Sequence, residues 1–402
     1  MSTKRSSAKR RVMVVTGSRA EFGLLRPVME AVEKHKKLEL RVVVAGEHLL
    51  GPAQTWKEVA EEFAIEAKVA MQRASDRGRI DHAAACARGM AGFAAVMKKV
   101  QPEWVVVLGD RIEAFAAASA ASIGGVAVCH IHGGDRAEGI ADEAMRHAIT
   151  KLAHLHCAAT KGSAERIRKM GEPAKLVHVT GSPAIDGLSS VKAMGDRDAK
   201  KYGDPESVIL IHPSGLDAEA ERLIVAGALN GAMWSGCVPC LVLAPNRDPG
   251  SEVVRTTARR TAQLITSRAL ASDLKYFTFC DHMPRPEFLS LLKRLSHRRL
   301  GMIIGNSSAG LIEAAALGLK TINIGPRQNG RERGANVFDV PFDKRAWDVE
   351  TTVESVIERA DRRGSRAMGS RFGDGRSGPR IAALLTKVDP RDGALLRKQN
   401  SY

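Results

Sequence analysis

Two carboxylates, a guanidinium and an imidazole lie close together in DEAMRHAITKL, a segment with helical periodicity. They belong to Asp142, Glu143, Arg146 and His147. A helix places Asp142 beside Arg146 and Glu143 beside His147, because residues four apart lie on adjacent turns of one face. Such a cluster can stabilise developing charge and transfer protons. Taken alone, it also fits an exposed, salt-bridged helix face, which contributes little to stability.

Polar residues also follow the short apolar runs that recur in the first half of the chain. Those at the ends of the runs are Arg19, His48, Asp110, Arg111, His130 and His132. The turn after the first run opens a helix whose free N–H groups suit an anion, and Arg19 can add a bidentate phosphate contact. An ordinary strand-to-helix loop explains this segment equally well. Alternation puts His130 and His132 on one face of a strand, but no third ligand stands at a suitable spacing, so we predict no metal site.

The second half has a similar arrangement of polar residues. His212 ends one apolar run, Asn246 ends the next, and the segment GNSSAGLIE follows a third and opens a helix. The hydroxyls of Ser307 and Ser308, with the N–H groups of the helix start, can hold a phosphate without a lysine. Glu313 lies a turn or so further on, where a carboxylate can hold ribose hydroxyls. Helix capping alone explains either serine, but not the whole set.

These residues need a scaffold, and the alternation of apolar β-branched runs with helical patterns indicates parallel sheets covered by helices. The predicted strands are Arg11–Thr16, Leu38–Ala45, Glu103–Leu108, Val126–Ile131, His156–Ala159, Leu176–Thr180, Val208–His212, Pro239–Ala244, Tyr276–Cys280, Met302–Ile304 and Thr321–Ile324. The predicted helices include Leu24–His35, His82–Val100 and Arg111–Ile123. We expect an α/β fold of two Rossmann-like domains facing a cleft, with ligands outside the carboxyl ends of the strands.

Changes in composition set the expected domain boundaries. Residues 1–11 form a basic tail, 12–193 a first domain and 207–375 a second, nucleotide-binding domain, and 376–402 a helix with a basic tail. The polar stretch 194–206 is the expected linker.

The net charge of the chain limits the classes of partner that it is expected to bind. Lys and Arg number 61 against 45 Asp and Glu, a net charge of +16, which suits nucleic acid, an anionic membrane or a phosphorylated small molecule. Much of the excess lies at the two ends, and only 4% of residues are aromatic. Nucleic-acid binding usually needs aromatics for base stacking, so we predict no such partner. No run of about 18 apolar residues occurs, so we predict no membrane span either.

The cysteines and the first residues of the sequence indicate the cellular compartment of the protein. Cys237 and Cys240 have the spacing of a redox or zinc motif, but no second pair follows, and we interpret them as structural. The basic start lacks the apolar region and cleavage site of a secretory signal. We therefore expect a cytoplasmic, reducing location.

Eight segments resemble the UDP-N-acetylglucosamine 2-epimerase family, above all its hydrolysing branch, which makes N-acetylmannosamine for sialic-acid-type sugars. They are TGSRAEFGLLRP, GEHL, LGDRIEAFAAA, HIHGGD, DEAMRHAITKLAHLH, HP, GNSSAGLIEA and NIGPRQNGRERGANV, in the family order from Thr16 to Val337. The resemblance implies the glycosyltransferase-B fold, a nucleotide-sugar substrate, no cofactor, and a homodimer or homotetramer.

The resemblance also implies roles for the matching residues. The implied catalytic set is Asp110, Asp142, Glu143, Arg146 and His212. The implied substrate-binding set is Arg19, His48, Arg111, His132, Asn246, His282, Ser307, Ser308 and Glu313, with the two serines at the diphosphate and Glu313 at the ribose. His132 stands where the non-hydrolysing branch typically has a glutamate. Asp135 and Ser214-Gly215 depart from the usual Glu and Val-Thr of hydrolysing relatives, which leaves the sugar and the nucleotide base open.

The resemblance implies elimination of the nucleoside diphosphate to give a glycal, followed by hydration with inversion at C2. Three other functions stay open at this point. A non-hydrolysing epimerase keeps the nucleotide on the product, and a glycosyltransferase uses the same two-domain cleft with an acceptor. A nucleic-acid or membrane-surface binder would act through the basic ends.

Overall fold

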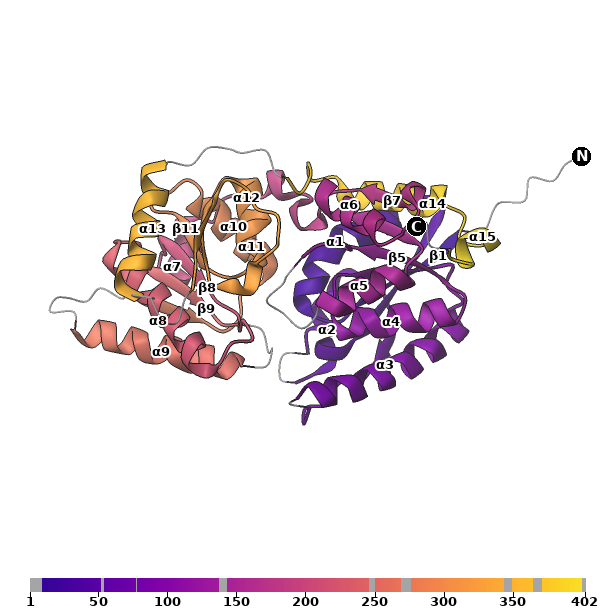
Figure 1. The fold of residues 1–402 in the computed structure, drawn as a ribbon, viewed down its shortest axis with the longest axis horizontal. Helices are drawn as coiled ribbons and strands as arrows, with labels where there is room; N and C mark the ends of the chain where they lie inside the picture. The colour runs from indigo at the N-terminus through magenta and orange to yellow at the C-terminus, as the bar shows by residue number, and fades with distance from the viewer. Residues whose placement is uncertain are drawn as a thin grey trace, which may run out of the picture. The chain divides into compact units, whose positions relative to one another are not determined.

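The computed structural model describes residues 9–51, 54–76, 78–136, 143–245, 250–268, 276–342, 349–363 and 371–399. Its contacts divide the chain into two compact units (Figure 1). The first unit takes its described residues from 1–135, 142–186 and 372–402, and the second takes them from 136–141 and 187–371.

The first unit contains a seven-stranded parallel sheet in the order β3-β2-β1-β4-β5-β6-β7. Its strands are β1 (Arg10–Thr16), β2 (Leu38–Ala45), β3 (Ile65–Val69), β4 (Trp104–Leu108), β5 (Ala127–Ile131), β6 (Leu155–Ala158) and β7 (Val177–Val179). Strand β3 was not predicted, because its residues Ile65–Val69 include two charged side chains among only three apolar ones.

Helices cover both faces of this sheet, as the continuous apolar strands require. They are α1 (Arg19–Lys34), α2 (Trp56–Glu62), α3 (Arg79–Val100), α4 (Ile112–Ile123), α5 (Glu143–Leu152), α6 (Lys161–Lys169), α14 (Ser377–Lys387) and α15 (Gly393–Leu396). Alternate residues of β1 enter two cores. Val12 and Val14 pack with α1 and α14, whereas Met13 and Val15 pack with α3 and α4.

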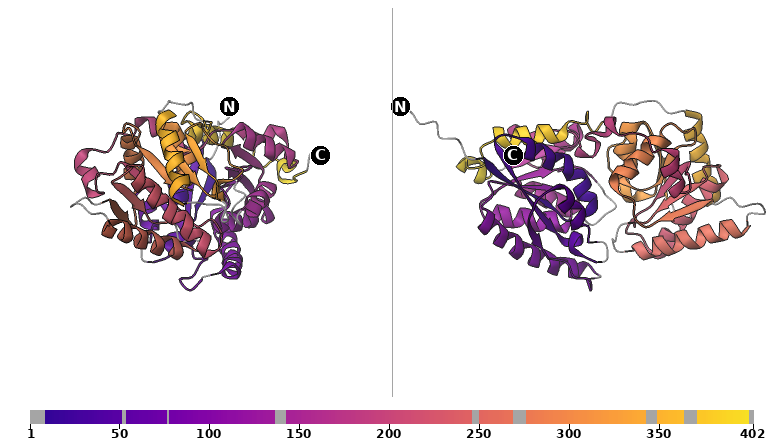
Figure 2. Two further views of the ribbon diagram at one scale, coloured as in Figure 1. Left: turned by 60° about the vertical axis from the view of Figure 1, so that its left-hand side comes forward. Right: turned by 180° about the vertical axis from the view of Figure 1, so that it is seen from behind.

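The C-terminal segment returns to the first unit, where α14 packs against α1, as the view from behind in Figure 2 shows. Arg10 Nη1 donates to the carbonyls of Leu385, Thr386 and Val388 at 3.0, 2.8 and 2.8 Å, at the end of α14. The indole of Trp104 donates to Leu385 O at 3.1 Å. The end of the chain is therefore an integral part of this unit rather than a separate tail.

The second unit contains a six-stranded parallel sheet in the order β10-β9-β8-β11-β12-β13. Its strands are β8 (Ser207–Leu210), β9 (Cys240–Leu243), β10 (Phe277–Cys280), β11 (Met302–Gly305), β12 (Lys320–Ile324) and β13 (Val337–Val340). The short β13 also escaped prediction. The order has the same reversal next to the first strand as that of the first unit, the pattern of a doubly wound Rossmann-like sheet.

Its helices also lie in two layers. Those that pack with Ile209 and Ile304 are α8 (Ala218–Trp234), α9 (Ser251–Arg268) and α13 (Val349–Arg363). Those on the face of Val208 and Leu210 include α7 (Asp196–Lys201), α10 (Arg285–Leu295) and α12 (Glu313–Leu317), which follows the short α11 (Ser308–Leu311). Five 3₁₀ turns complete the described elements: η1 (Gly46–Leu49), η2 (Ala174–Leu176), η3 (Pro183–Ile185), η4 (Leu188–Ser190) and η5 (Pro326–Gln328).

The stretch 194–206, expected as a linker, is folded into the second unit. It contains α7, and its Met194 and Ala199 are buried in the core beside α10. Arg294 of α10 holds it by donating to Met194 O at 3.1 Å and pairing with Asp196 and Asp204 at 2.7 and 2.9 Å. The polar composition that indicated a linker therefore belongs to the exposed face of a packed segment.

Two observations concern a membrane and a metal ion as partners of the chain. Among the helices that the structure describes, none has both the length and the apolar composition that crossing a bilayer requires. Within the same residues, no three His, Cys, Asp or Glu side chains gather in a way that could hold a metal ion.

Candidate functional site

Several of the predicted polar residues follow strands at which the topology favours a ligand. In a doubly wound sheet, the loops after the first strand and after its neighbour across the reversal diverge and leave a crevice. These strands are β1 and β4 in the first unit, and β8 and β11 in the second. Each unit carries one group of candidate residues there.

In the first unit, Asp110 follows β4 and forms an ion pair with Arg146 of α5. Burial by itself lowers the pKa of Arg146, but Asp110 and Asp135 raise it above its ordinary value, so the guanidinium stays charged. Arg146 is 2% exposed, and its Nε and Nη1 have no hydrogen-bond partner among the described residues. Asp142, the partner predicted from helical spacing, lies outside the described residues.

Glu143 and His147 form the other pair that helical spacing predicted. Glu143 begins α5, and its Oε1 lies 3.4 Å from Nε2 of His147. The Glu143 side chain is 21% exposed. Asp110, Arg146 and Glu143 thus bring one buried guanidinium and two half-buried carboxylates to α5 and the loop after β4.

Two further carboxylates, Glu21 and Glu113, are buried beside this pair. The Gly17 amide donates to Glu21 Oε2 at 2.8 Å, and Gln72 Nε2 donates to Glu113 Oε1 at 2.8 Å. Burial and the charge of Glu113 raise the pKa of Glu21 to about 8. Burial also acts to raise the pKa of Glu113, but Arg111 and Gln72 outweigh it and lower that pKa. The pair therefore holds one proton at neutral pH.

Gly17 is required for this packing. A Cβ at Gly17 would lie 2.5 Å from Cγ of Glu113, closer than Cβ atoms approach other carbons. The loop after β1 therefore touches the start of α4 through a position where a side chain does not fit.

His48 and Arg111 surround the same two carboxylates. His48 contacts the hydroxyls of Thr16 and Thr55 through Nε2 and Nδ1, at 3.0 and 2.8 Å, and burial lowers its pKa to about 4. Arg111 pairs with Glu47 at 3.1 Å and with Glu113 at 3.3 Å. Both residues are engaged in fixed contacts, so they shape the loops after β2 and β4.

His130 and His132 serve different contacts, contrary to the prediction that they share one strand face. His130 lies in β5, where burial lowers its pKa to about 3 and its Nε2 lies 2.8 Å from Gly109 O. His132 lies beyond the strand with a φ of 62°, a conformation that few residues other than glycine adopt. Its Nδ1 and Nε2 contact Asp135 and Ser182 at 2.8 and 2.9 Å.

In the second unit, the side chain of Asn306 joins the ends of β8 and β11. Its Oδ1 accepts from the His212 amide at 2.7 Å, and its Nδ2 donates to His212 O at 2.8 Å and to Ser214 Oγ at 3.1 Å. Gln328 and Arg327 of η5 donate to Asn306 O at 2.7 and 3.3 Å. These contacts hold His212 in place, and burial with the charge of Arg327 lowers its pKa to about 3.

The two serines begin a broken helix. Ser307 is the N-cap of α11 and accepts from the Ala309 amide at 3.4 Å. The helix breaks at Ile312 and resumes as α12 with Glu313, whose carboxylate pairs with Arg285 at 2.9 Å. Capping thus explains Ser307 as predicted, whereas Ser308, at the first helical position, is half-buried and its hydroxyl makes no hydrogen bond to the residues that the structure describes.

Three other predicted residues stand apart. Arg19 begins α1 and is half-buried. Its charge acts to lower the pKa of Glu58, but burial of that carboxyl has the larger effect and raises the pKa. His282 is exposed in the loop before α10. Asn246 lies outside the described residues.

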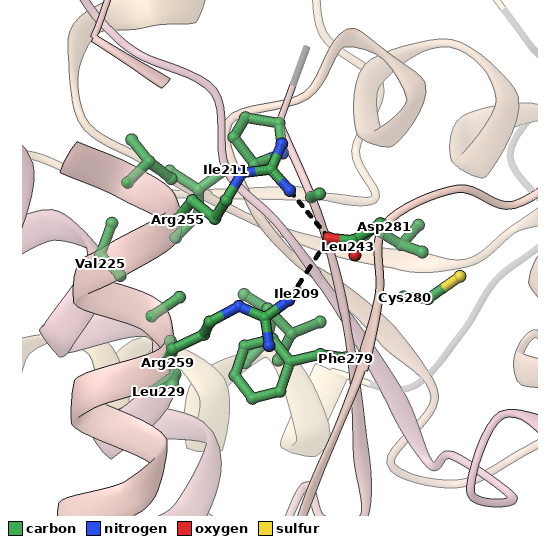
Figure 3. Close-up of a pocket in the computed structure, with 15 residues that line it drawn as sticks. Ile209, Ile211, Val225, Leu229, Leu243, Arg255, Arg259, Phe279, Cys280 and Asp281 are labelled. Atoms are coloured by element: carbon green, nitrogen blue, oxygen red, sulfur yellow. Dashed lines mark hydrogen bonds and ion pairs between the residues drawn. The ribbon is translucent and has the colours of Figure 1, made fainter. Parts of the chain in front are cut away.

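A hollow in the second unit contains none of the predicted residues (Figure 3). It lies between β8, β9 and β10 and helices α8 and α9, with Arg255 and Arg259 donating to Asp281 at its edge at 2.8 and 3.4 Å. Its volume of about 20 Å³ is room for a water molecule, not for a sugar or a nucleotide.

Local sequence patterns did not indicate Glu21, Glu113, Asn306 or Gln328 as site residues. A usable signal existed for Glu113, which is the single charge in the Ala-rich helix α4 and stands three residues after Asp110. Asn306 and Gln328 act by binding backbone atoms of distant segments, so their contacts leave no pattern in the local sequence.

Comparison with known proteins relates the chain to a family of enzymes. It matches the sequence model of a family described as UDP-N-acetylglucosamine 2-epimerase over residues 30–386. It is 31% identical to a UDP-N,N'-diacetylbacillosamine 2-epimerase (hydrolyzing) of Legionella pneumophila, over 98% of this chain and 100% of that one. It is 29% identical to a UDP-N-acetylglucosamine 2-epimerase of Neisseria meningitidis, over 83% and 84%.

A solved structure shares the fold. The UDP-GlcNAc 2-epimerase of Neisseria meningitidis bound to UDP-GlcNAc superimposes with a TM-score of 0.75 at 18% identity, covering 94% of this chain and 100% of that one. The two-sheet α/β architecture predicted from the sequence is confirmed. The length of the family match, with the near-complete overlap of the Legionella relative, shows that this chain belongs to the UDP-N-acetylglucosamine 2-epimerase family.

Proposed function

We propose that this chain is a hydrolysing nucleotide-sugar 2-epimerase. It converts UDP-N-acetylglucosamine, or a related UDP- or GDP-linked N-acetyl amino sugar, to the free 2-epimer and a nucleoside diphosphate. The observation that carries the proposal is the pair of the buried Arg146 with Asp110, with Glu143 at the start of the helix that carries Arg146, in a chain of the epimerase family. These residues supply the charge and proton acceptors that the reaction needs.

The chemistry explains why carboxylates are required. The C2 hydrogen of the bound sugar is not next to a carbonyl, so a base cannot remove it directly. Breaking the C1–O bond sends the electron pair to the diphosphate and leaves positive charge at C1, which carboxylates such as Asp110 and Glu143 stabilise. Loss of the C2 proton to one of these carboxylates then gives the 1,2-unsaturated sugar.

Hydration completes the cycle. Water adds its hydroxyl to C1, and a proton returns to C2 from the opposite face, which inverts that centre. The acid that returns the proton is either His212 or a carboxyl group. His212 is neutral at pH 7, because burial lowers its pKa to about 3, so it must first accept a proton before it can donate one.

The second unit supplies the groups that suit the leaving diphosphate. Ser307 and Ser308 begin the helix after β11, and the guanidinium of Arg327, which follows β12, donates to the carbonyl of Asn306, the residue before Ser307. Neutral hydroxyls and a cation stabilise the negative charge that grows on the diphosphate as the C1–O bond breaks. Glu313 is the proposed ribose contact. Its hydrogen bonds to the ribose hydroxyls replace the ion pair that it forms with Arg285 in this structure.

Isotope incorporation tests the proposal. Incubation with UDP-N-acetylglucosamine in D2O is expected to give UDP and free N-acetylmannosamine that carries deuterium at C2, as measured by NMR and mass spectrometry. Release of UDP with a C2-unlabelled glucosamine product would overturn the epimerase assignment. Profiling UDP- and GDP-linked sugars, including diacetylbacillosamine, identifies the preferred substrate.

The second candidate is a non-hydrolysing epimerase, which the family match also allows. It is less well supported, because His132 occupies the position of the glutamate typical of that branch and because the Legionella relative is named as hydrolysing. Formation of UDP-N-acetylmannosamine in place of the free sugar would favour it.

A further inference from the structure

One residue of the basic C-terminal tail, Lys398, lies at the end of the helix that carries Glu143 and Arg146. Its Nζ donates to the carbonyls of Thr150, Lys151 and Ala153 at 3.0, 2.6 and 2.6 Å. These carbonyls belong to the last turn of α5 and the residue after it, where helical carbonyls lack partners within the helix. An ammonium group there also interacts favourably with the negative end of the helix dipole.

A buried carboxylate holds the ammonium in this place. Glu172, whose side chain is 0% exposed, lies 2.7 Å from Lys398 Nζ and also pairs with Lys151 at 2.8 Å and with His156 at 3.1 Å. The interactions with His156, Lys151 and Lys398 outweigh the effect of burial and lower the pKa of Glu172 to about 2. Lys398 therefore has an ionised partner as well as three carbonyl acceptors.

The same helix turn is connected to the candidate catalytic pair. The Thr150 hydroxyl lies 3.1 Å from Arg146 O and 3.2 Å from His130 Nδ1. His130 Nε2 lies 2.8 Å from the carbonyl of Gly109, the residue before Asp110. Thr150, whose carbonyl Lys398 binds, thus contacts through its hydroxyl both the backbone of Arg146 and the histidine that holds the Asp110 loop.

We infer that Lys398 is a positioning residue, which caps α5 and so fixes the Arg146–Asp110 pair through Thr150 and His130. This inference rests on the proposed function, because it assigns the pair to the reacting sugar. A small tilt of α5 would move Arg146 relative to the loop after β4, and displacement of a catalytic group by about 1 Å can lower a rate a hundredfold. The expected effect falls on kcat, because the proposed diphosphate contacts lie in the other unit.

Three variants test the inference with UDP-N-acetylglucosamine as substrate. Lys398→Met removes the charge and the three donors but keeps most of the apolar stem. Lys398→Arg restores a cation that can bind carbonyls. Lys387→Met is the matched control, because Lys387 is an exposed lysine of the same C-terminal segment.

Release of UDP gives the kinetic readout. Lys398→Met is expected to lower kcat about tenfold with KM within about twofold, Lys398→Arg to recover most of the loss, and Lys387→Met to match the wild type. A kcat of wild-type size in Lys398→Met would overturn the inference. So would an equal loss in Lys398→Met and Lys398→Arg with a raised KM in both.

A second pair of variants tests the inference independently in case Lys398→Met folds poorly. Thr150→Ser keeps the hydroxyl that contacts Arg146 O and His130, and Thr150→Val removes it at similar volume. The valine variant is expected to lose kcat and the serine variant to keep it, and equal kcat in the two would contradict the inference.

Amide hydrogen exchange separates this inference from the proposed function. Faster exchange in peptides of α5 is expected for Lys398→Met and not for Lys387→Met, whatever the enzyme's substrate. Wild-type protein without activity on nucleotide sugars would refute the proposed function alone. Unchanged exchange of α5 in Lys398→Met would refute the positioning role alone.

Discussion

The candidate residues of the two units occupy the same topological position in sheets of similar order, but they differ in chemistry. At the ends of β1 and β4, the first unit buries Glu21, Glu113 and Arg146, which pairs with the half-buried Asp110. At the ends of β8 and β11, the second unit uses mainly the neutral side chains of Asn306 and Gln328, bonded to backbone atoms.

The difference in side-chain chemistry suits the two units to different tasks in the proposed reaction. Buried carboxylates have shifted pKa values and respond strongly to nearby charge, which suits proton transfer and the stabilisation of a cationic sugar. Amides, hydroxyls and a guanidinium bind an anion without changing their protonation. The comparison therefore predicts that changes in the first unit affect kcat and changes in the second affect KM.

The largest effect is expected from Asp110→Asn. The substitution removes the counter-charge of buried Arg146 and a carboxylate proposed to act on the sugar, so kcat should fall on the order of a thousandfold. UDP release measures the change, and circular dichroism checks that the variant folds. A folded variant with kcat within about tenfold of wild type would remove Asp110 from the proposed mechanism.

A stability effect is expected from Glu21→Gln. The raised pKa of about 8 means that folded Glu21 keeps its proton, while unfolded Glu21 ionises near the ordinary glutamate pKa of 4.5. The folded state thus binds more protons between these values, so the free energy of unfolding of the wild type falls as pH rises from 5 to 8.

The glutamine variant cannot lose a proton there, so it should gain on the order of 3 kcal/mol relative to the wild type over that interval. Urea unfolding at pH 5 and pH 8 measures the difference. Parallel pH dependence in the two proteins would show that Glu21 is ionised in the folded state.

A smaller effect, confined to binding, is expected from Ser308→Ala. Loss of one hydroxyl contact to a charged phosphate should raise KM about tenfold and leave kcat within a few-fold. Steady-state kinetics across substrate concentrations separate the two constants. A fall in kcat with an unchanged KM would contradict the division of tasks between the units.

The smallest effect is expected from Asp281→Asn. This carboxylate of the second unit is 66% exposed and pairs with Arg255 and Arg259 at the surface. Exposed ion pairs of this kind contribute less than about 1 kcal/mol, so the unfolding free energy should change by no more than that. Thermal and urea unfolding measure it, and a loss of several kcal/mol would show that charges matter to this unit as they do to the first.

Local patterns were enough for most of the strands, though not for β3 and β13, and for the loops that end the predicted ones. Leu38–Ala45 has the predicted bounds, since a mostly apolar run that ends in three consecutive valines and an alanine is typical of a strand whose end is buried on both faces. The spacing of Glu143 and His147 likewise predicted their contact, because a helix brings residues four apart together whatever surrounds it.

Other features depend on contacts between segments far apart along the chain. Arg146 pairs with Asp110, 36 positions away, and Lys398 binds the end of α5 across 245 or more positions. The amino-acid order was sufficient for the fold class, the family resemblance and the strand ends that carry polar residues, because these follow from periodicity and short motifs. Partners, burial and protonation required the folded chain, because desolvation and pairing arise only when distant segments pack together.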